Sequence, residues 1–528
     1  MKSVFLALMF AALPQEEEAK TSGIAGVAEL VQATVKVEGS LPKRFSYGFG
    51  QTEGWEVYAF STEEREGLVA LIGGYGRTPD IGEKSGLSVL FFLHFYANRT
   101  AFLELQILND AMDNPPGAVN VDYEVRFRGD VVASGTRRMA DETGLGFTGG
   151  EPFFAPREDL WEKYLSQMPL AGSVHGISRT DAEKKEDPDE VRNTHQSGSP
   201  RNRWASIEAS KYAQTGDDRY LARLMDFVMA QARRPYHLSE KNGEPFLFSK
   251  YPDARFIEGK PEKRAYLETF GRILLEDSDF DNGGYNGWDH EHMNVEELYA
   301  AYVMLGSRIA RRELVLIAEE LLSTRYVKDE GKHQHSARAF GWNARALIRA
   351  WQATGEERYR NAVRRMMDSL RAHWSPAGAY RTLIAQKPRN DHMPDQMWES
   401  PFMVAVATST IALYLREEGE DEEARELLKF CGDLLVERGY SPAGGGFYYD
   451  YSAESSDKTG DGTKTRGVVF YIVSPLVDVA EFVPENERQK YLTPAKRMFD
   501  LNKNEPWGSP ASDVYHRWFL KAAREFNP

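Results

Sequence analysis

The sequence predicts a multidomain α and β protein, in which an N-terminal antiparallel β-sandwich precedes a ring of helical hairpins. Three observations predict this fold class. Apolar and polar residues alternate within residues 24–150, as they do in strands with one solvated face. From about residue 196 to residue 528 the apolar spacing becomes helical. Short turns that combine glycine with acidic residues then separate one helix from the next.

The first twenty residues have the pattern of a secretory signal peptide. Lys2 precedes an apolar run from Val4 to Pro14, which is too short to span a bilayer. Cys431 is the single cysteine of the 528 residues, so the protein is expected to fold without intramolecular disulfides. We therefore expect a secreted or periplasmic protein with residues 1–20 removed.

Strand patterns fill residues 24–150. Val119 to Phe127 alternates strictly, and Gly129 with Asp130 then turns the chain. Residues 89–96 are apolar on both faces, which predicts a central strand. Further strands are predicted at 55–60, 68–72, 102–108 and 131–132. Residues 151–195 form a connector, in which residues 158–165 are expected to be helical.

The helical part repeats one unit, a hairpin of two helices. Gln214 to Leu221 and Ala353 to Arg360 have similar turns, in which a glycine is expected to form the left-handed C-cap. The predicted pairs are 199–214 with 218–233, 290–305 with 309–325, 336–353 with 356–373, 400–417 with 420–438, and 466–482 with 486–503. Residues 262–276 and 511–526 are predicted to add further helices. Irregular spacing favours a closed ring over a solenoid, with the first helix of each pair inside.

These turns, the stretch Gly287 to Met293 and the stretch His335 to Trp342 resemble the (α/α)6 toroid of carbohydrate-active enzymes. An N-terminal β-domain before such a toroid is similar to several polysaccharide lyases and glycoside hydrolases. The resemblance covers roughly residues 196–526. It implies a polysaccharide-degrading enzyme with a polysaccharide or oligosaccharide substrate, and it does not single out one family whose catalytic residues can be carried over.

Histidine, arginine, tryptophan and tyrosine residues gather in the long loops that precede the inner helices. Loops on a rigid scaffold are where binding and catalysis concentrate. The net charge of −15, without a basic tract, argues against nucleic acid as a partner. A β-elimination on a uronate polymer needs a base, an acid and a cation near the carboxylate. The candidate catalytic residues are His292, His290, Tyr285, His335, Asp289 and Glu399.

The predicted substrate-binding residues include indole rings, which match the apolar faces of sugars. They are Trp288, Arg338, Trp342, Asp391, His392, Trp398, His195 and Tyr449. We predict no metal site and no cofactor. Zinc ligation by the histidines and calcium at Asp457 to Gly462 remain open as minor alternatives, because the spacings match neither a standard zinc motif nor a complete calcium loop.

The favoured function is a lyase acting on a uronate-containing polysaccharide, since histidine and arginine are abundant in these loops. The runner-up is a glycoside hydrolase, in which Asp289 pairs with Glu399 or Asp391 as acid and base. A sugar isomerase is a further alternative. The alternative from another class is a non-catalytic carbohydrate-binding protein. Each hypothesis places the ligand at the same end of the ring.

Overall fold

The computed structural model describes residues 30–48, 51–62, 65–80, 86–110, 119–139, 143–167, 206–233, 236–239, 244–250, 256–257, 266–267, 272–273, 295–324, 327, 336–373, 398–452, 455–459, 466–502 and 526. The chain forms two compact units, each assembled from separate stretches. The first combines Met1–Trp161, Asp217–Trp288 and Ala300–Leu316, and the second combines Glu162–Gly216, Asp289–Tyr299 and Ile317–Pro528. Within the described residues, no helix is both long and apolar enough to cross a membrane.

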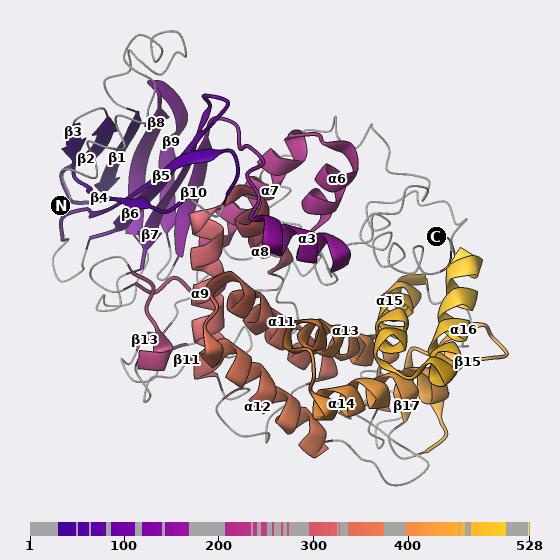
Figure 1. The fold of residues 1–528 in the computed structure, drawn as a ribbon. Coiled ribbons are helices and arrows are strands. Elements are labelled where there is room, and N and C mark those ends of the chain that lie inside the picture. The colour runs from indigo at the N-terminus through magenta and orange to yellow at the C-terminus, as the bar shows by residue number, and fades with distance from the viewer. Residues whose placement is uncertain are drawn as a thin grey trace. The chain divides into compact units, whose positions relative to one another are not determined.

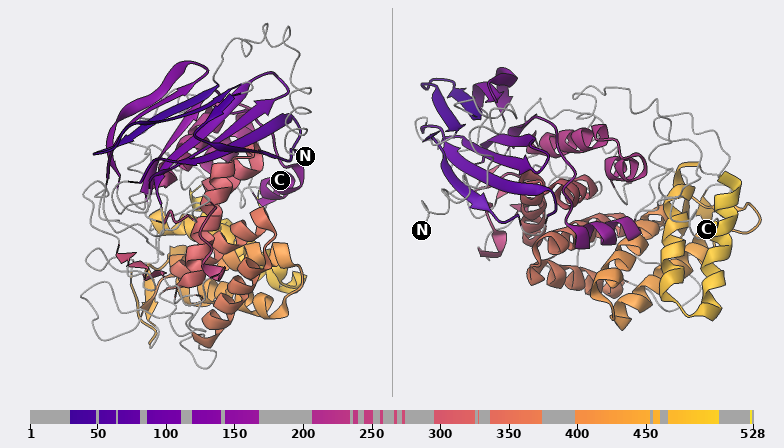
Figure 2. Two further views of the ribbon diagram at one scale, coloured as in Figure 1. Left: turned by 90° about the vertical axis from the view of Figure 1, so that its left-hand side faces the viewer. Right: turned by 45° about the horizontal axis from the view of Figure 1, so that its top comes forward.

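The first unit contains the predicted β-sandwich (Figures 1 and 2). Its sheets have five strands each, in the orders β3-β2-β1-β8-β9 and β10-β7-β6-β5-β4. The strands of the first sheet are β1 Val31–Val37, β2 Lys43–Gly48, β3 Gln51–Glu53, β8 Val119–Phe127 and β9 Asp130–Met139. Those of the second are β4 Glu56–Phe60, β5 Leu68–Arg77, β6 Ser88–Tyr96, β7 Ala101–Asn109 and β10 Thr143–Gly149. One hydrophobic cluster joins inward-facing side chains of both sheets.

The predicted strands are all present, and the apolar strand occupies the predicted place. β6 is buried along its whole length and lies in the middle of its sheet. β8 and β9 meet at a two-residue turn, because Phe127 pairs with Asp130. Arg128 and Gly129 both have positive φ, at 55° and 90°, which is the conformation of a tight hairpin turn. The strands β1, β2, β3 and β10 had not been predicted individually.

The second sheet is also covered on its outer face, the one that does not face the sandwich core. Helix α7 (Arg219–Ala230) and the 3-10 turn η1 (Gln231–Arg233) pack on β10. Gly146 permits this approach, since a Cβ atom there would lie 2.7 Å from the carbonyl oxygen of Met229. Both faces of β6 and β7 are therefore buried.

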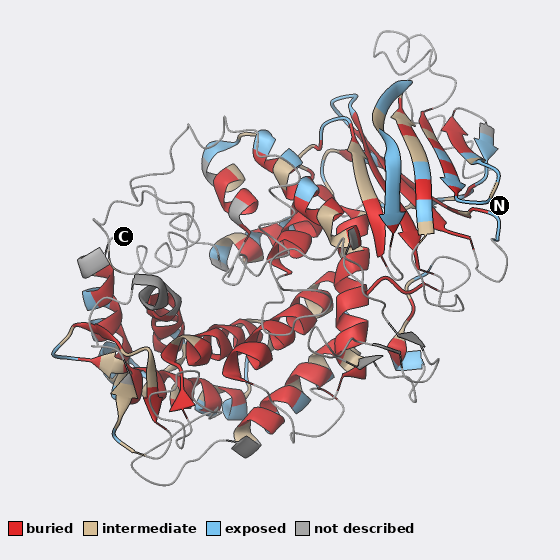
Figure 3. Cartoon of the chain, turned by 180° about the vertical axis from the view of Figure 1, so that it is seen from behind, coloured by how far each residue is buried: buried red, intermediate tan, exposed pale blue. Residues whose placement is uncertain are grey.

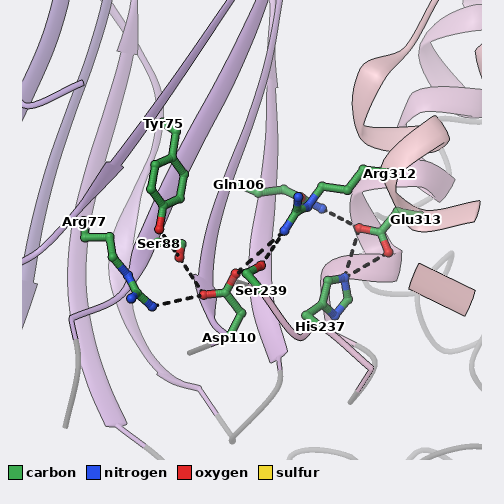
Figure 4. Close-up of polar contacts among 9 residues, drawn as sticks. All are labelled: Tyr75, Arg77, Ser88, Gln106, Asp110, His237, Ser239, Arg312 and Glu313. Carbon is green, nitrogen blue, oxygen red and sulfur yellow. Dashed lines mark hydrogen bonds and ion pairs between the residues drawn. The ribbon is translucent and has the colours of Figure 1, made fainter. Parts of the chain in front are cut away.

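Polar side chains on this covered face form a closed network (Figure 4). Asp110 accepts hydrogen bonds from Ser88 Oγ, at 2.6 Å, and from Ser239 Oγ. Arg312 donates to the same Ser239 hydroxyl at 2.5 Å. The Arg77 guanidinium lies 3.9 Å from Asp110. Asp110 and Ser239 are buried, so this network ties the sheet to the segment 236–239 and is not an open site.

Glu313 is another buried carboxylate of this layer. It accepts a hydrogen bond from Gln106 Nε2 at 2.7 Å and contacts His237 Nε2 at 2.9 Å. Burial alone would raise the pKa of Glu313, but the neighbouring His237 and the hydrogen bonds hold that pKa below its usual value of 4.5. Glu313 therefore stabilises the fold in its ionised form.

We expect Glu313→Gln to cost about 2–3 kcal/mol of unfolding free energy at neutral pH. The folded-state pKa lies below the unfolded one, so the ionised carboxylate contributes its full stability above about pH 4.5. That contribution is lost as the pH falls through the folded-state pKa. Thermal unfolding at pH 7 and pH 4 should show a smaller gap between wild type and variant at the lower pH. A gap of equal size at both values would contradict this account.

The second unit is built mainly from helices, and the helices of all five predicted pairs are present in the chain. Their helices are α6 Ile207–Thr215 with α7, α8 Glu296–Leu305 with α9 Arg308–Ser323, α11 Ala337–Thr354 with α12 Glu357–His373, α13 Pro401–Glu418 with α14 Glu422–Asp433, and α15 Arg466–Phe482 with α16 Glu485–Asn502. Helix α7 lies wholly within the first unit, and α8 and α9 are each divided between the two units. The expected left-handed C-caps are confirmed at Gly216 and Gly355, where φ is 65° and 73°.

In the three hairpins from α11 to α16, the first helix is the inner one of its pair. Helix α13 packs on both α11 and α15, while α12, α14 and α16 each pack on the preceding helix of their own pair. α11 and α13 are buried on nearly every side (Figure 3). The outer helices alternate between buried and exposed residues. Closure of the hairpins into a complete toroid remains a prediction.

One predicted helix is wrong. Within residues 262–276 the structure has the short strands β12 (Tyr266–Leu267) and β13 (Arg272–Ile273), and β12 also pairs with β11 (Phe256–Ile257). Gly271 interrupts the helical pattern, and propensity over so short a segment is easily overridden by pairing. The connector helix is confirmed as α3 (Glu158–Gln167). The predicted helix at 511–526 lies outside the described residues except for Phe526.

Candidate active site

The described candidate residues lie in helix α11, in the segment just before helix α13 and in the loop that precedes helix α15. They are Arg338, Trp342, Trp398, Glu399 and Tyr449. The remaining candidates lie outside the described residues: His195, Tyr285, Trp288, Asp289, His290, His292, His335, Asp391 and His392. Their proposed roles therefore remain predictions.

Helices α11 and α13 run in the same direction, which places their N-terminal ends together. The contacts show this, since Arg338 lies by Phe402, while further along Thr410 Oγ1 donates to the carbonyl of Gly341 at 3.0 Å. Ser336 caps α11 by accepting a hydrogen bond from the N–H of Ala339. Two helix N-termini carry partial positive charge, so this end favours an anionic ligand.

A guanidinium and a phenol both lie beside one aromatic ring at this end. Arg338 Cζ is 5.7 Å from the centre of the Phe402 ring. The Phe402 and Tyr449 rings are 6.5 Å apart between centres. Ser400 Oγ donates to the carbonyl of Tyr449 at 2.8 Å, which ties the loop before α15 to the start of α13. Arg338 is buried, whereas Tyr449 is half-buried.

Glu399 is engaged in a buried hydrogen bond. Strand β14 (Trp398–Glu399) pairs with β17 (Asp450–Ser452), which in turn pairs with β18 (Lys458–Thr459). Tyr451 is the direct partner of Glu399, and its hydroxyl donates to Glu399 Oε2 at 2.6 Å. Burial and the nearby Glu399 raise the pKa of Tyr451 well above its usual value, so the phenol stays protonated. The carboxylate is 3% exposed, which closes it to a large substrate.

The two tryptophans contribute buried rings instead of open stacking surfaces. Trp342 lies inside α11 and is 1% exposed, and Trp398 is 4% exposed. No described residue places an acceptor within hydrogen-bonding distance of Trp398 Nε1. A sugar stacked on either ring face would need a rearrangement of the surrounding side chains.

Trp398→Phe should leave the free energy of unfolding within about 1 kcal/mol of wild type, because no described residue accepts a hydrogen bond from the indole N–H that it removes. The matched variant is Trp55→Phe, in the β-sandwich. Trp55 Nε1 donates to the carbonyl of Val89 at 3.2 Å, and losing this bond should cost about 1–3 kcal/mol. Denaturant unfolding of both variants provides the comparison. Equal losses in the two variants would show that the indole N–H of Trp398 has an acceptor.

Charged side chains at the opposite end of these helices are paired with one another. Glu418, at the end of α13, binds Arg360 and Arg364 of α12. Arg416 binds Asp478 at 2.6 Å and Glu481 at 2.5 Å. The turn end of the described hairpins is thus fastened by ion pairs, and the candidate site lies at the other end.

Sequence reasoning did not single out Phe402 or Arg438 as part of this region. Phe402 follows the Pro401 that starts α13, and Arg438 lies in the π-helix η6 (Leu434–Gly439) that extends α14. A π-helical segment is a common mark of a functional region, but sequence alone does not reveal it. In the part of the chain that the structure describes, no three His, Cys, Asp or Glu residues gather to hold a metal ion.

No family model and no curated protein matches this chain. Solved structures with some similarity include a sugar epimerase from a ruminal bacterium, with TM-score 0.39 and 11% identity over 62% of this chain and 87% of that chain. Cellobiose 2-epimerase from Bacillus thermoamylovorans has TM-score 0.40 and 12% identity over 70% and 98%. Unsaturated glucuronyl hydrolase from Streptococcus agalactiae has TM-score 0.40 and 12% identity over 67% and 97%. Similarities this low decide neither the fold nor the activity of this chain.

Proposed function

We propose that this protein is a carbohydrate-active enzyme that cleaves a uronate-containing polysaccharide by β-elimination. The observation that carries the proposal is that Arg338 and Tyr449 both lie beside the Phe402 ring, at the joined N-terminal ends of α11 and α13. A guanidinium and a phenol are two of the three groups that this reaction requires.

Each group has a defined task in the elimination. A base removes the proton on the carbon next to the uronate carboxylate, and the electron pair forms a double bond to the neighbouring carbon. The bond from that carbon to the linking oxygen breaks, and the oxygen takes up a proton. Arg338 and the two helix N-termini stabilise the negative charge that builds on the carboxylate. Tyr449 supplies the proton to the leaving oxygen, and His290 or His292 with Tyr285 are the proposed base.

The burial of Glu399 favours elimination over hydrolysis. A hydrolase needs one carboxyl group as acid and a second as base or nucleophile, both facing the glycosidic bond. Glu399 is buried and bonded to Tyr451, so it does not present an open carboxylate. A hydrolase on this scaffold would take both carboxylates from other residues, such as Asp289 and Asp391.

A substrate panel tests the proposal. The purified protein would be incubated with uronate polymers and with neutral glycans, while ultraviolet absorbance and new reducing ends are followed together. A lyase generates the conjugated unsaturated product, so absorbance should rise with reducing ends on a uronate polymer only. Reducing ends without absorbance would support the hydrolase. Saturable binding without any product would support a non-catalytic carbohydrate-binding protein.

A further inference from the structure

Glu399 lies near Cys431, a residue of the outer helix of its own hairpin. Cys431, on α14, is fully buried, and burial together with the nearby Glu399 raises the pKa of its thiol. The Glu399 carboxylate is bonded to Tyr451, which is 0% exposed. Such buried and hydrogen-bonded surroundings suit a carboxylate that anchors neighbouring residues. A carboxylate that contacts a substrate would need to be accessible from solvent.

Arg438 is a second residue that holds Tyr451 and its strand. The Arg438 guanidinium carbon lies 5.2 Å from the centre of the Tyr451 ring. Arg438 Nη2 also donates to the carbonyl of Ser452 at 2.6 Å and to that of Ser455 at 3.1 Å. Strand β17 is therefore held in two ways. The Glu399 carboxylate accepts from the Tyr451 side chain, and the Arg438 guanidinium donates to the backbone carbonyl of Ser452.

This anchored strand begins one residue after Tyr449. Glu399 is followed by Ser400, whose hydroxyl donates to the Tyr449 carbonyl. The end of β14 and the residue after it thus hold Tyr451 within β17 and Tyr449 just before that strand. A shift of β17 along β14 would move Tyr449 relative to Phe402 and Arg338. Displacements of about 1 Å at a reacting group can cost about 10²-fold in rate.

We propose that Glu399 and Tyr451 are positioning residues, which hold the Tyr449 phenol in place for the elimination reaction. The inference deepens the proposed function and rests on it. Glu399 acts as a hydrogen-bond acceptor for Tyr451, and its charge takes no part in proton transfer to the substrate.

Two substitutions at Glu399 separate positioning from catalysis. Glu399→Gln keeps an oxygen that accepts the Tyr451 hydroxyl, whereas Glu399→Leu removes it. We expect Glu399→Leu and Tyr451→Phe to lower kcat by about 10-fold to 10²-fold with little change in KM, and Glu399→Gln to lose far less. Tyr440→Phe makes the same chemical change as Tyr451→Phe on the nearby strand β15 (Tyr440–Ser441) and serves as the control. Equal losses of kcat in Glu399→Gln and Glu399→Leu would overturn the proposal.

A second measurement does not depend on activity. Hydrogen exchange of the backbone amides in residues 448–452 reports how firmly β17 is held. We expect faster exchange in Glu399→Leu and Tyr451→Phe, with Glu399→Gln close to wild type. Unchanged exchange in Tyr451→Phe would overturn the proposal even if the variants at Glu399 fail to fold. If wild type shows no elimination on any substrate, the proposed function fails while this exchange pattern still tests the anchoring itself.

Discussion

Replacing Glu296 with glutamine should lower the unfolding free energy of the helical unit by about 3–5 kcal/mol. Glu296 begins α8 and is fully buried between two arginines of α11. Its Oε1 accepts from Arg345 Nη1 at 2.9 Å, and its Oε2 accepts from Arg349 Nη2 at 3.0 Å. Arg345 and Arg349 are 4% and 1% exposed, so both charges would remain buried without their carboxylate. Uncompensated buried charge is the physical reason for so large a loss.

Denaturant unfolding followed by far-ultraviolet circular dichroism would measure this loss. Glu422→Gln is the matched control, because the Glu422 side chain is 78% exposed and its nearest contact with Arg425 is 3.9 Å. The control should change the free energy of unfolding by less than about 0.5 kcal/mol. A Glu296→Gln protein as stable as the control would mean that the two arginines find other partners.

Replacing Tyr449 with phenylalanine should reduce kcat on a uronate polymer by about 10²-fold or more, because the leaving oxygen loses its proton donor. The aromatic ring and its contact with Phe402 remain, so the unfolding temperature should stay unchanged. Tyr448→Phe is the natural control, since Tyr448 is the neighbouring residue and its ring lies 4.5 Å from Lys458 Nζ. Full activity in Tyr449→Phe would assign the acid to another residue, such as Tyr285.

The sequence predicts the helical hairpins well because each turn carries its own signal. Glycine ends one helix, and acidic residues begin the next, as at Gly355 and Glu357. The covered face of the second sheet could not be foreseen in the same way. Glu104, Gln106 and Asp110 alternate with apolar residues and resemble a solvated strand face. They are buried because α7 and residues 236–239 and 307–313 lie against that face, and these segments come about a hundred residues or more later in the chain.

The candidate site, too, could be predicted from the sequence only in part. Arg338, Glu399 and Tyr449 were predicted from their places before or at the start of inner helices, and the structure brings them to adjoining helix ends. The sequence could not show that Glu399 would meet Tyr451 across two strands, because the pairing register depends on the tertiary fold. It also could not show that the Trp398 ring would be buried, since a tryptophan in a loop is equally consistent with an exposed stacking surface.

The most direct measurement of the central claim is the mass of the products formed in water enriched with oxygen-18. Elimination adds no water to the cleaved bond, so the account predicts that the products contain no label and that the fragment with the new non-reducing end is lighter by one water than a hydrolysis product. Hydrolysis transfers one oxygen from water to the new reducing end. Incorporation of the label into that end, beyond the exchange seen in a control of pre-formed oligosaccharide, would contradict the account.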